Sequence, residues 1–596
     1  MERYVYIAGA DPGADRSLVE FAIATLLADC VGAVRLYRPL AHDPKQPDAV
    51  ARAADETAHH GRVRAAAGLA YRDAVRVQAG SGREALLAAL VDRGLDLEYD
   101  NEVVLACGID TAAADLPDAT DLDARIAAEL NAATVLVHDG HGRDVGELEA
   151  QAHNRIRAYR ARRCDVVAVI CTGTTPGVRE SLTARIGVPV HALPEAPLPP
   201  AAGPERERAA LALFTATVDT AALTAALTAP RPKRLTPMRF LRRMLDTARR
   251  HDCRLVLPEA TDERVLRAAD FLHRRTGTGV ILLGDFARIR SAIVTLGLDL
   301  DTSRDDVRVI DPLTSPLRGE LAQHYLVSRE VHGHHLGLWE ATDLLADPNY
   351  FGAMMVERGY ADGMVSGAAH STVDTLIPAF RTVGLAPGAA LASSVLFLCL
   401  PERVLVFADC AVNRDPDAGQ LADIAIASAA TAEHFGLPAR VAMISYSTGD
   451  SDRGIDVDKV RRATEIVGQR HPDLLITGPI QYDAAVDPDI AAVKAPDSPV
   501  AGAATVLVFP DLDTGNAVYK AVREATGAVT VGPVLQGLHR PINDLSRGAT
   551  VRDIAATMAA TAVQATNSSR PHDSAERTGA GKVNRCSEPS GILPSR

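Results

Sequence analysis

The chain has 596 residues, far more than one ordinary hydrophobic core contains, so its length alone predicts several folded domains. Hydrophobic residues make up 47% and charged residues 23%, which is the composition of a globular protein. The 63 Lys and Arg against 76 Asp and Glu give a formal charge of −13, which excludes a general attraction to nucleic acid and predicts that any anion site is local.

The first residues and the apolar runs bear on localisation. The opening MERYVYIAGADPG enters a strand-like run at once and lacks the pattern of a signal peptide. The longest apolar runs, such as ALASSVLFLCLP, are shorter than the roughly 20 residues that cross a bilayer. We therefore expect a cytoplasmic protein without membrane association. The eight cysteines are scattered without a CxxC pair, so neither a zinc knuckle nor a disulfide framework is expected.

Residues 1–200 alternate short apolar strands with helical stretches, which predicts an α/β domain. The predicted strands are RYVYIAG, EVVLACGID, ATVLVHDG and DVVAVICTG. Runs such as VVLAC are apolar on both faces, as parallel strands covered by helices are. Prolines and charges then concentrate in LPEAPLPPAAGPERER and APRPKRLTP, so we expect a linker over residues 201–232.

A loop that resembles a nucleotide phosphate loop follows the first predicted strand. GADPGADRS, residues 9–17, opens a helix as a Walker A loop does, but Asp15 and Arg16 occupy the positions of its Gly and Lys. A carboxylate repels phosphate, and Arg is not equivalent to Lys there. We expect a degenerate P-loop-like domain with a scaffold or regulatory role rather than ATP hydrolysis; sensing of a nucleotide or metabolite stays an alternative.

The alternation resumes over residues 233–565, which predicts a second and larger α/β body. Its predicted strands are RLVLPEA, GVILLGD, DGMVSGA, VLVFAD, VAMISYS, ATVLVFPD and AVTVGPVLQG. Residues 566–596 are polar, rich in Pro, Gly and Ser and without periodicity, so we expect a disordered tail.

The most informative segment of this body runs from residue 532 to residue 565. Its turn NDLSRG places Ser546 and Arg547 just before a predicted helix, where a hydroxyl, a guanidinium and backbone amides can face one anion. Asp553 follows at the third helical position if Thr550 caps the helix. Spacing alone favours a structural role for Asp553, because T-x-x-D is close to a capping box.

Two further loops and a histidine cluster are candidates. ADGMVSGAAHSTVDT, residues 361–375, follows a strand and offers the hydroxyls of Ser366, Ser371 and Thr372. KAPDSPVAG combines Lys494 with two prolines, although a rigid surface turn explains it equally well. The cluster HGHH has no acid or Cys at ligand spacing, so we expect a solvated loop rather than a metal site; its histidines are His332, His334 and His335.

Taken together, these loops make residues 235–565 resemble the phosphate acetyltransferase family. The segments that carry the resemblance, in the family's order, are PEATDERVLRAA, DPNYFGAMMV, ADGMVSGAAHST, ERVLVFADCAVNRDP, QLADIAIASA, RVAMISYSTGDS, GPIQYDAAV, KAPDSPVAG, FPDLDTGNAVYKAV and NDLSRG. The resemblance implies a two-part α/β phosphate acyltransferase domain with the active site in the cleft between the parts, assembled as a homo-oligomer.

Residues 1–200 resemble the dethiobiotin-synthetase-like domain at the front of long family members, on the segment GIDTAAADLPDATDLDARIAAELNAATVLVHDGHGR. Long members hold a further regulatory domain in the middle. Here only a short linker separates the two bodies, so the resemblance implies that the middle domain is missing.

The resemblance also implies an activity: acetyl-CoA and phosphate give acetyl phosphate and CoA, with a functional link to acetate kinase. It implies direct attack in a ternary complex, with Asp553 as general base and Ser546 as hydrogen-bond donor to the acyl oxygen. Arg547 and Arg329 would bind phosphate. The Ser366 to Thr372 loop and Lys494 would line the CoA and phosphate cleft. No tightly bound cofactor and no metal are expected, because coenzyme A is a substrate.

Two positions depart from the family pattern. HSTVDTLIPAF has Ile377 where the family has an arginine, and Arg381, four residues on, lies on the same face if the helix continues. The segment after Arg329 is longer than in the family by a few residues. Two alternative functions stay open: a phosphate butyryltransferase or enzyme of another acyl chain, and a catalytically impaired regulatory homologue.

Overall fold

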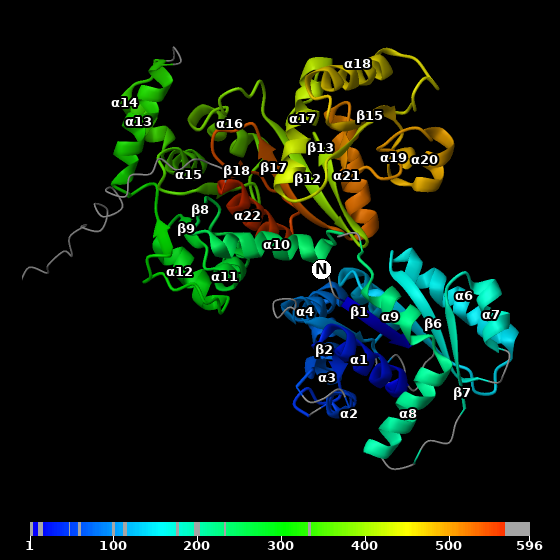
Figure 1. The fold of residues 1–596 in the computed structure, drawn as a ribbon. Coiled ribbons are helices and arrows are strands. Elements are labelled where there is room, and N and C mark those ends of the chain that lie inside the picture. Colours follow the sequence, from blue (N-terminus) through cyan, green and yellow to red (C-terminus); the bar gives the residue numbers. More distant parts are fainter. Residues whose placement is uncertain are drawn as a thin grey trace, which may run out of the picture. The chain divides into compact units, whose positions relative to one another are not determined.

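The structure is a computed structural model, and it describes residues 4–9, 16–46, 48–57, 61–97, 102–110, 116–174, 178–195, 199, 203–231, 234–331 and 335–566. The chain divides into two compact units. The first comprises Met1–Asp246 and Ser393–Val531, and the second comprises Thr247–Ala392 and Gly532–Arg596. Three sheets with helices between their strands confirm the predicted α/β class (Figure 1).

The N-terminal part of the first unit is built on a seven-stranded sheet of order β3-β2-β4-β1-β5-β6-β7, in which the described pairs are parallel. Two apolar clusters, one on each face of the sheet, form the core. Its strands are β1 (Tyr4–Gly9), β2 (Val34–Ala41), β3 (Val63–Ala70), β4 (Val103–Cys107), β5 (Ala133–Asp139), β6 (Asp165–Thr174) and β7 (Val190–Pro194). Its helices are α1 (Ser17–Val31), α2 (Ala49–Thr57), α3 (Tyr71–Ser81), α4 (Arg83–Asp96), α5 (Ala119–Glu129), α6 (Val145–Ala161), α7 (Val178–Ile186), α8 (Pro204–Thr217), α9 (Thr220–Thr228) and α10 (Pro237–Arg250).

The end of the phosphate-loop-like segment is described from Arg16 onward, and residues 10–15, with Asp15, lie outside the described residues. The guanidinium of Arg16 donates to the carbonyl oxygen of Gly108, at the carboxyl end of β4, over 2.9 Å. The same side chain lies 3.7 Å from the buried carboxylate of Glu20. Arg16 is therefore engaged with its own domain where a P-loop lysine would reach a nucleotide.

The remaining part of the first unit holds a six-stranded sheet of order β15-β14-β16-β13-β12-β17. β12 runs antiparallel to β13, whereas β13, β16, β14 and β15 pair in parallel. The strands are β12 (Ser393–Leu400), β13 (Arg403–Ala408), β14 (Arg440–Ile444), β15 (Leu475–Ile480), β16 (Val506–Val508) and β17 (Val529–Gln536). The helices are α17 (Ala418–His434), α18 (Ile455–Arg470), α19 (Tyr482–Val486), α20 (Pro488–Lys494) and α21 (Leu512–Thr526).

The second unit is built on a five-stranded sheet of order β10-β9-β8-β11-β18, with every described pair parallel. The strands are β8 (Arg254–Leu257), β9 (Gly279–Leu283), β10 (Val307–Ile310), β11 (Gly363–Val365) and β18 (Ile542–Asn543). The helices are α11 (Glu263–Thr276), α12 (Phe286–Thr295), α13 (Leu317–Val331), α14 (Leu338–Leu344), α15 (Pro348–Glu357), α16 (Thr372–Thr382) and α22 (Val551–Ala565).

Aspartate starts many of these helices, because its carboxylate accepts hydrogen bonds from first-turn amides that have no partner within the helix. Asp262 caps α11, Asp285 caps α12, Asp347 caps α15, Asp417 caps α17 and Asp511 caps α21. Three of these five helices, α11, α12 and α21, begin within about six residues of the end of a strand, so their caps follow the carboxyl ends of strands, where sites form in parallel sheets.

No single helix among the described residues is long and apolar enough to cross a membrane; the bent pair α8 and α9, at 89° to one another, passes that test only jointly. All seven described cysteines are free, and only Cys30 is exposed. The expected tail lies outside the described residues from residue 567 onward.

Candidate functional site

The carboxyl edge of the five-stranded sheet gathers three loops of the second unit. β8, β11 and β18 are neighbours in the sheet and run parallel, so the segments that follow them emerge side by side. They are residues 258–262, residues 366–371 and residues 544–550. The second and third contain four of the eight site residues predicted from the sequence, Ser366, Ser371, Ser546 and Arg547, and the first contributes Glu259.

Glu259 fills a nest of backbone amides in the loop that follows β11. Its carboxylate accepts hydrogen bonds from the amides of residues 367, 368, 369 and 370, at 2.6 to 2.9 Å. It also accepts from Nδ1 of His370 at 2.7 Å. Glu259 is only 5% exposed, so these donors compensate the cost of burying its charge. The loop after β11 therefore binds an internal carboxylate through its backbone amides.

Arg264, in the first turn of α11, connects all three loops. Its guanidinium binds the carboxylate of Asp262, in its own loop, at 2.8 Å. It donates to the carbonyl oxygen of Ala368 at 2.8 Å and to those of Arg547 and Ala549 at 2.8 and 3.0 Å. One side chain thus sets the spacing between the loop after β11 and the loop with Ser546.

Ser546 and Arg547 lie at the tip of the loop after β18. Ser546 is half-buried, and Arg547 is exposed. The amide of Gly548 makes a long hydrogen bond of 3.4 Å to Ser546 Oγ, and the amide of Ala549 donates to the Ser546 carbonyl oxygen at 2.8 Å. No hydrogen bond or ion pair within the described residues engages the Arg547 guanidinium, which leaves it available to an anion.

Asp553 occupies the third position of α22, as its spacing from Thr550 predicts. Its Oδ2 accepts from the amide and the hydroxyl of Thr550, both at 2.9 Å, and its own amide donates to the Thr550 hydroxyl at 3.2 Å. This is a complete capping box. Asp553 is 5% exposed. It therefore has the structural role of a helix cap, and a catalytic role would come in addition to that.

Asp544 is a second buried carboxylate, two residues before Ser546. It is 1% exposed, and burial raises its pKa to about 6, while the hydroxyls of Thr372 and Thr375 and the amide of Leu545 oppose that rise. A Cβ at Gly367, where φ is +105°, would lie 2.3 Å from Asp544 Oδ1, so this position admits only glycine. The two loops are in direct contact here.

The three hydroxyl residues predicted in the loop after β11 have different surroundings. Ser366 is fully buried, and its Oγ donates to Oδ1 of Asn349, on α15, at 2.7 Å. Ser371 caps α16 together with Asp374, to which its amide and hydroxyl donate at 2.9 and 2.7 Å. Thr372 begins α16, beside Asp544. The structure therefore places Ser371 and Thr372, rather than Ser366, at the surface of this loop.

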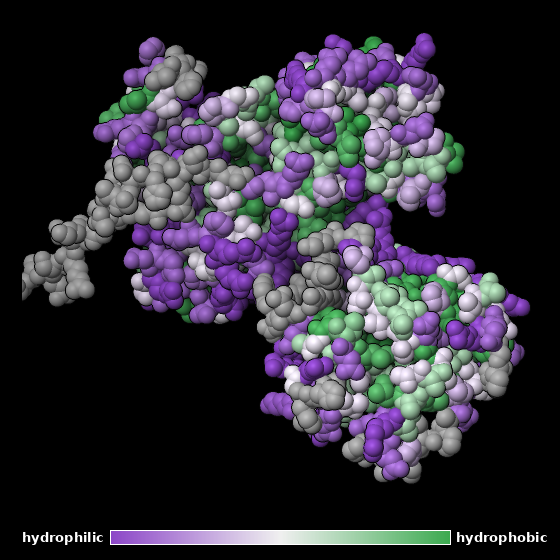
Figure 2. All heavy atoms as spheres, viewed as in Figure 1, coloured by the Kyte–Doolittle hydropathy of each residue, from purple (hydrophilic) through white to green (hydrophobic). Residues whose placement is uncertain are grey.

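Arg329 lies in the last turn of α13, immediately before residues 332–334, which lie outside the described residues together with His332 and His334. His335 is exposed. The longer segment ends in α14, whose Trp339 is 78% exposed, and Figure 2 shows apolar atoms among hydrophilic ones over α13 and α14. Within the described residues, no hydrogen bond or ion pair joins the Arg329 side chain to any of the three loops, so its predicted phosphate role rests on the resemblance alone.

α16 contains both Ile377, where the family has an arginine, and Arg381, four residues further on. Ile377 is 39% exposed and, as the helix requires, shares a face with Arg381. The Arg381 guanidinium donates to the hydroxyl of Tyr350, on α15, at 3.0 Å. Arg381 is exposed at the surface of the second unit, so it can still meet a ligand there.

Lys494 belongs to the first unit, at the end of α20. Its ammonium donates to Oε1 of Gln481 at 3.0 Å and to Oδ2 of Asp483 at 2.8 Å. This bond to Lys494 is the main reason why the pKa of Asp483 is lowered. The lysine is one-third exposed and is held by its own unit.

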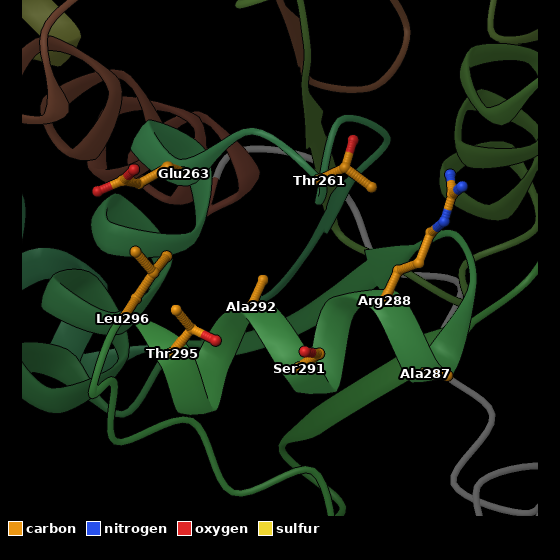
Figure 3. Close-up of a pocket in the computed structure, with 8 residues that line it drawn as sticks. All are labelled: Thr261, Glu263, Ala287, Arg288, Ser291, Ala292, Thr295 and Leu296. Atoms are coloured by element: carbon orange, nitrogen blue, oxygen red, sulfur yellow. The ribbon is translucent and has the colours of Figure 1, made fainter.

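A separate shallow pocket of about 590 Å³ lies on α12. Figure 3 shows small side chains along α12, with Arg288 at one end, opposite Glu263 in the first turn of α11 and Thr261 in the loop before that helix. None of the predicted site residues lines it. Within the described residues, no group of three or more His, Cys, Asp or Glu could hold a metal ion.

Sequence motifs alone do not single out Glu259, Arg264, His370 and Asp544, although all four stand in segments that carry the resemblance. A signal was present, because an acidic residue directly after a buried parallel strand lies at the edge where sites form. Glu259 follows β8 by two residues, and Asp544 follows β18 immediately.

Comparisons with known proteins relate both parts of the chain to known families. Residues 239–562 match the family described as Phosphate acetyl/butaryl transferase, and residues 3–198 match the family described as AAA domain. The chain is 51% identical over 356 residues to the phosphate acetyltransferase of Nitratidesulfovibrio vulgaris, which covers 60% of this chain and 50% of that protein. For the phosphate acetyltransferase of Escherichia coli the values are 45% over 340 residues, 56% and 46%.

A phosphotransacetylase of Streptococcus pyogenes has a similar solved structure, with 40% identity and a TM-score of 0.51. The likeness covers 55% of this chain and 98% of that protein. By contrast, the chain spans about half the length of the curated relatives that it matches.

Proposed function

Because the chain belongs to the phosphate acetyl/butaryl transferase family, we propose that it moves an acetyl group between coenzyme A and inorganic phosphate. The observation that carries the proposal is the extent of the family match, which takes in all three loops at the carboxyl edge of the second unit's sheet. Identities of 45 to 51% to proteins named phosphate acetyltransferase support acetyl as the acyl group.

In the proposed mechanism, Asp553 takes the proton of the CoA thiol. A free thiol has a pKa near 8.5, so at neutral pH it needs a base, and a positioned base contributes roughly 10² to 10⁴ in rate. The Thr550 cap holds the Asp553 carboxylate in one orientation through Oδ2. The thiolate then attacks the carbonyl carbon of acetyl phosphate directly, the bond from that carbon to the phosphate oxygen breaks, and phosphate leaves.

Ser546 and Arg547 stabilise the negative charges of the acyl oxygen and of the phosphate in this step. Ser546 donates a hydrogen bond to the acyl oxygen as that oxygen gains negative charge. Arg547, exposed beside it, binds the phosphate group, and Arg329 is proposed to assist. Arg264 holds the backbone of Arg547 in place, so it acts on the phosphate through Arg547.

A second candidate function is transfer of a longer acyl chain. One observation favours it: Val373, Ile377 and Phe380 expose apolar side chains along one face of α16, which starts at the loop after β11. An arginine in place of Ile377 would interrupt this face. Relative turnover rates with acyl-CoA substrates of different chain length therefore decide which acyl group is transferred.

The test is thiol release from acetyl-CoA by the purified full chain, with and without inorganic phosphate. We expect release that requires phosphate and yields acetyl phosphate. Faster turnover of butyryl-CoA than of acetyl-CoA would favour the second candidate. A folded chain that binds CoA but releases no thiol from either substrate would contradict both, and would favour a regulatory homologue without activity.

A further inference from the structure

Acyl transfer between sulfur and phosphate moves a proton at each end. When the thiolate displaces phosphate from acetyl phosphate, the leaving group carries three negative charges unless one of its oxygens gains a proton as the carbon–oxygen bond breaks. Asp553 accounts for the proton that leaves sulfur. If the proposed function is correct, a second group that can give and take a proton is needed on the phosphate side.

His370 has the surroundings of such a group. Its Nδ1 lies 2.7 Å from Oε1 of Glu259, whose side chain is 3% exposed. Because a carboxylate only accepts hydrogen bonds, Nδ1 carries a hydrogen, and Nε2 is the nitrogen that gains or loses the second proton. The imidazole is 53% exposed, and no hydrogen bond from the described residues reaches Nε2. A buried acid therefore orients an accessible ring, as in nucleophile–base–acid triads.

The ring lies next to the predicted phosphate-binding loop. His370 is two residues from Ala368, whose carbonyl oxygen shares the Arg264 guanidinium with the carbonyl oxygen of Arg547. The strands beneath the two loops, β11 and β18, are paired in parallel. The loop of His370 and the loop of Ser546 and Arg547 are thus fixed to one another by a single side chain and by the sheet.

Three neighbouring elements carry charged groups close to His370. Glu259 faces it from the loop after β8. Asp374 faces it from α16, and the pKa of Asp374 is lowered mainly by the Ser371 hydroxyl and additionally by His370. Arg264 binds the same loop from α11. No other histidine of the described residues lies in the three loops at this edge.

We propose that His370 is a catalytic residue on the phosphate side of the reaction, and that Glu259 is a positioning residue for it. Nε2 of the imidazolium donates its proton to a phosphate oxygen as the bond from that oxygen to the acetyl carbon breaks. The sulfur–hydrogen proton has gone to Asp553, so one proton enters the enzyme and one leaves it. In the opposite direction Nε2 removes the proton from phosphate as its oxygen attacks the thioester.

The first arm of the test does not need turnover. Diethyl pyrocarbonate modifies accessible imidazoles, and peptide mass spectrometry measures the modification of each histidine. His251 is the matched control, because it is exposed and its Nδ1 also bonds an oxygen, the carbonyl oxygen of Thr247 at 2.9 Å. We expect inorganic phosphate to slow modification of His370 at least fivefold and to leave His251 unchanged. Equal modification of His370 with and without phosphate would overturn the proposal.

The second arm uses variants of the full chain. His370→Ala is expected to lower kcat about 100-fold, to leave the KM for CoA within about twofold, and to regain activity in added imidazole, whereas His251→Ala keeps wild-type activity. Glu259→Gln is expected to lower kcat without rescue by imidazole. An active His370→Ala enzyme would overturn the proposal. If the wild-type chain itself releases no thiol, the proposed function fails, and the labelling arm still decides whether His370 meets phosphate.

Discussion

The guanidinium of Arg264 donates a hydrogen bond of 2.8 Å to the carbonyl oxygen of Arg547, a residue 283 positions further along the chain. This contact joins the start of the second unit's sequence to its end. A charged donor to a backbone carbonyl fixes a loop without occupying the side chain of the residue that it holds. Arg547 therefore keeps its own guanidinium for an anion.

Arg264→Lys tests this connection. A lysine keeps the charge but cannot donate in four directions, so the bonds to Ala368, Arg547 and Ala549 cannot all persist. We expect kcat/KM for phosphate to fall about 10- to 100-fold, a loss of roughly 1.4 to 2.7 kcal/mol in transition-state binding. Steady-state kinetics with varied phosphate measures it.

The control for Arg264→Lys lies on the same helix. Arg267 is exposed and pairs only with Glu263 among the described residues, over 2.7 Å. Arg267→Ala is expected to keep kcat/KM within about twofold, because exposed pairs contribute little. Equal effects of the two substitutions would mean that the helix, and not the Arg264 contact, matters.

Substitutions at Thr550 and Asp553 separate the structural role of Asp553 from its proposed catalytic role. Both residues form one capping box, but only Asp553 is proposed as the general base. Both Asp553→Ala and Thr550→Ala remove the reciprocal cap, which costs about 1 kcal/mol of stability. Only Asp553→Ala removes the proposed base, so we expect its kcat to fall roughly 10² to 10⁴-fold. Thermal unfolding and kcat are measured on both variants.

The result for Thr550→Ala decides between the interpretations. A similar loss of stability in both variants, with turnover lost only in Asp553→Ala, supports a base that is also a cap. If Asp553→Ala keeps the turnover of the wild type while both variants lose stability, the carboxylate serves the helix alone, and the spacing argument for a structural residue is sufficient.

The α/β class could be predicted because buried parallel strands are apolar on both faces. RYVYIAG, GVILLGD and VAMISYS coincide with β1, β9 and β14. β2 was missed, since VRLYRPLA interrupts its apolar residues with two arginines and a proline. β18 has two residues and therefore no periodicity to detect. Its place in the sheet is set by pairing with β11, which is a tertiary interaction.

The site residues could be predicted only in part, because their contacts also depend on tertiary structure. Sequence motifs identify polar side chains near strand ends, but not whether each one bonds inward or faces solvent. Ser366 and Ser371 stand five residues apart in one loop, and one is buried against Asn349 while the other caps α16. The backbone amides of the loop after β11 donate to Glu259, which lies 108 residues before Gly367, and no local sequence pattern connects the two.

Ser366 and Ser546 should respond differently to alanine. Ser366→Ala leaves Oδ1 of the buried Asn349 without its donor, which costs about 1 to 3 kcal/mol, so we expect a lower Tm with kcat nearly unchanged. Ser546→Ala is expected to lower kcat about 10²-fold at an unchanged Tm, because within the described part of the chain its half-buried hydroxyl makes only a long bond to Gly548. Differential scanning fluorimetry and steady-state rates distinguish them; a catalytic loss in Ser366→Ala would return that hydroxyl to the site.

Asp544 predicts a pH dependence of stability. Burial raises its pKa to about 6, against an ordinary value near 3.9, so the folded chain binds a proton between about pH 4 and pH 6 that the unfolded chain has released. Stability therefore falls as pH rises through this window, by on the order of 2 kcal/mol, and is level above it. Asp544→Asn is expected to remove this fall, so that the variant matches the wild type near pH 4 and has the higher Tm at pH 7.

Asp374 is a control for the direction of the pH dependence assigned to Asp544, because its own contribution to stability has the opposite direction. It is exposed, and the bond from the Ser371 hydroxyl lowers its pKa, so its contribution to stability is present at neutral pH and is lost on acidification. Asp374→Asn is expected to lower Tm slightly at pH 7, and this difference is expected to shrink as the pH falls below about 4. A Tm difference between Asp544→Asn and wild type that does not change from pH 4 to pH 7 would contradict the assignment to Asp544.

Substitutions at Arg381 test whether its guanidinium replaces the arginine that the family has at the position of Ile377. The helix places the two side chains on one face, and Tyr350 holds the guanidinium of Arg381 through one bond of 3.0 Å. If Arg381 binds a phosphate of CoA, Arg381→Ala raises the KM for CoA about tenfold and leaves kcat unchanged, while Tyr350→Phe, which removes only the internal bond, changes the KM by less than about threefold. Ile377→Arg in the Arg381→Ala background is then expected to restore the KM, because it returns a cation to the same helix face. An unchanged KM in Arg381→Ala would mean that the phosphates of CoA are bound elsewhere and that the apolar face of α16 serves another part of the substrate.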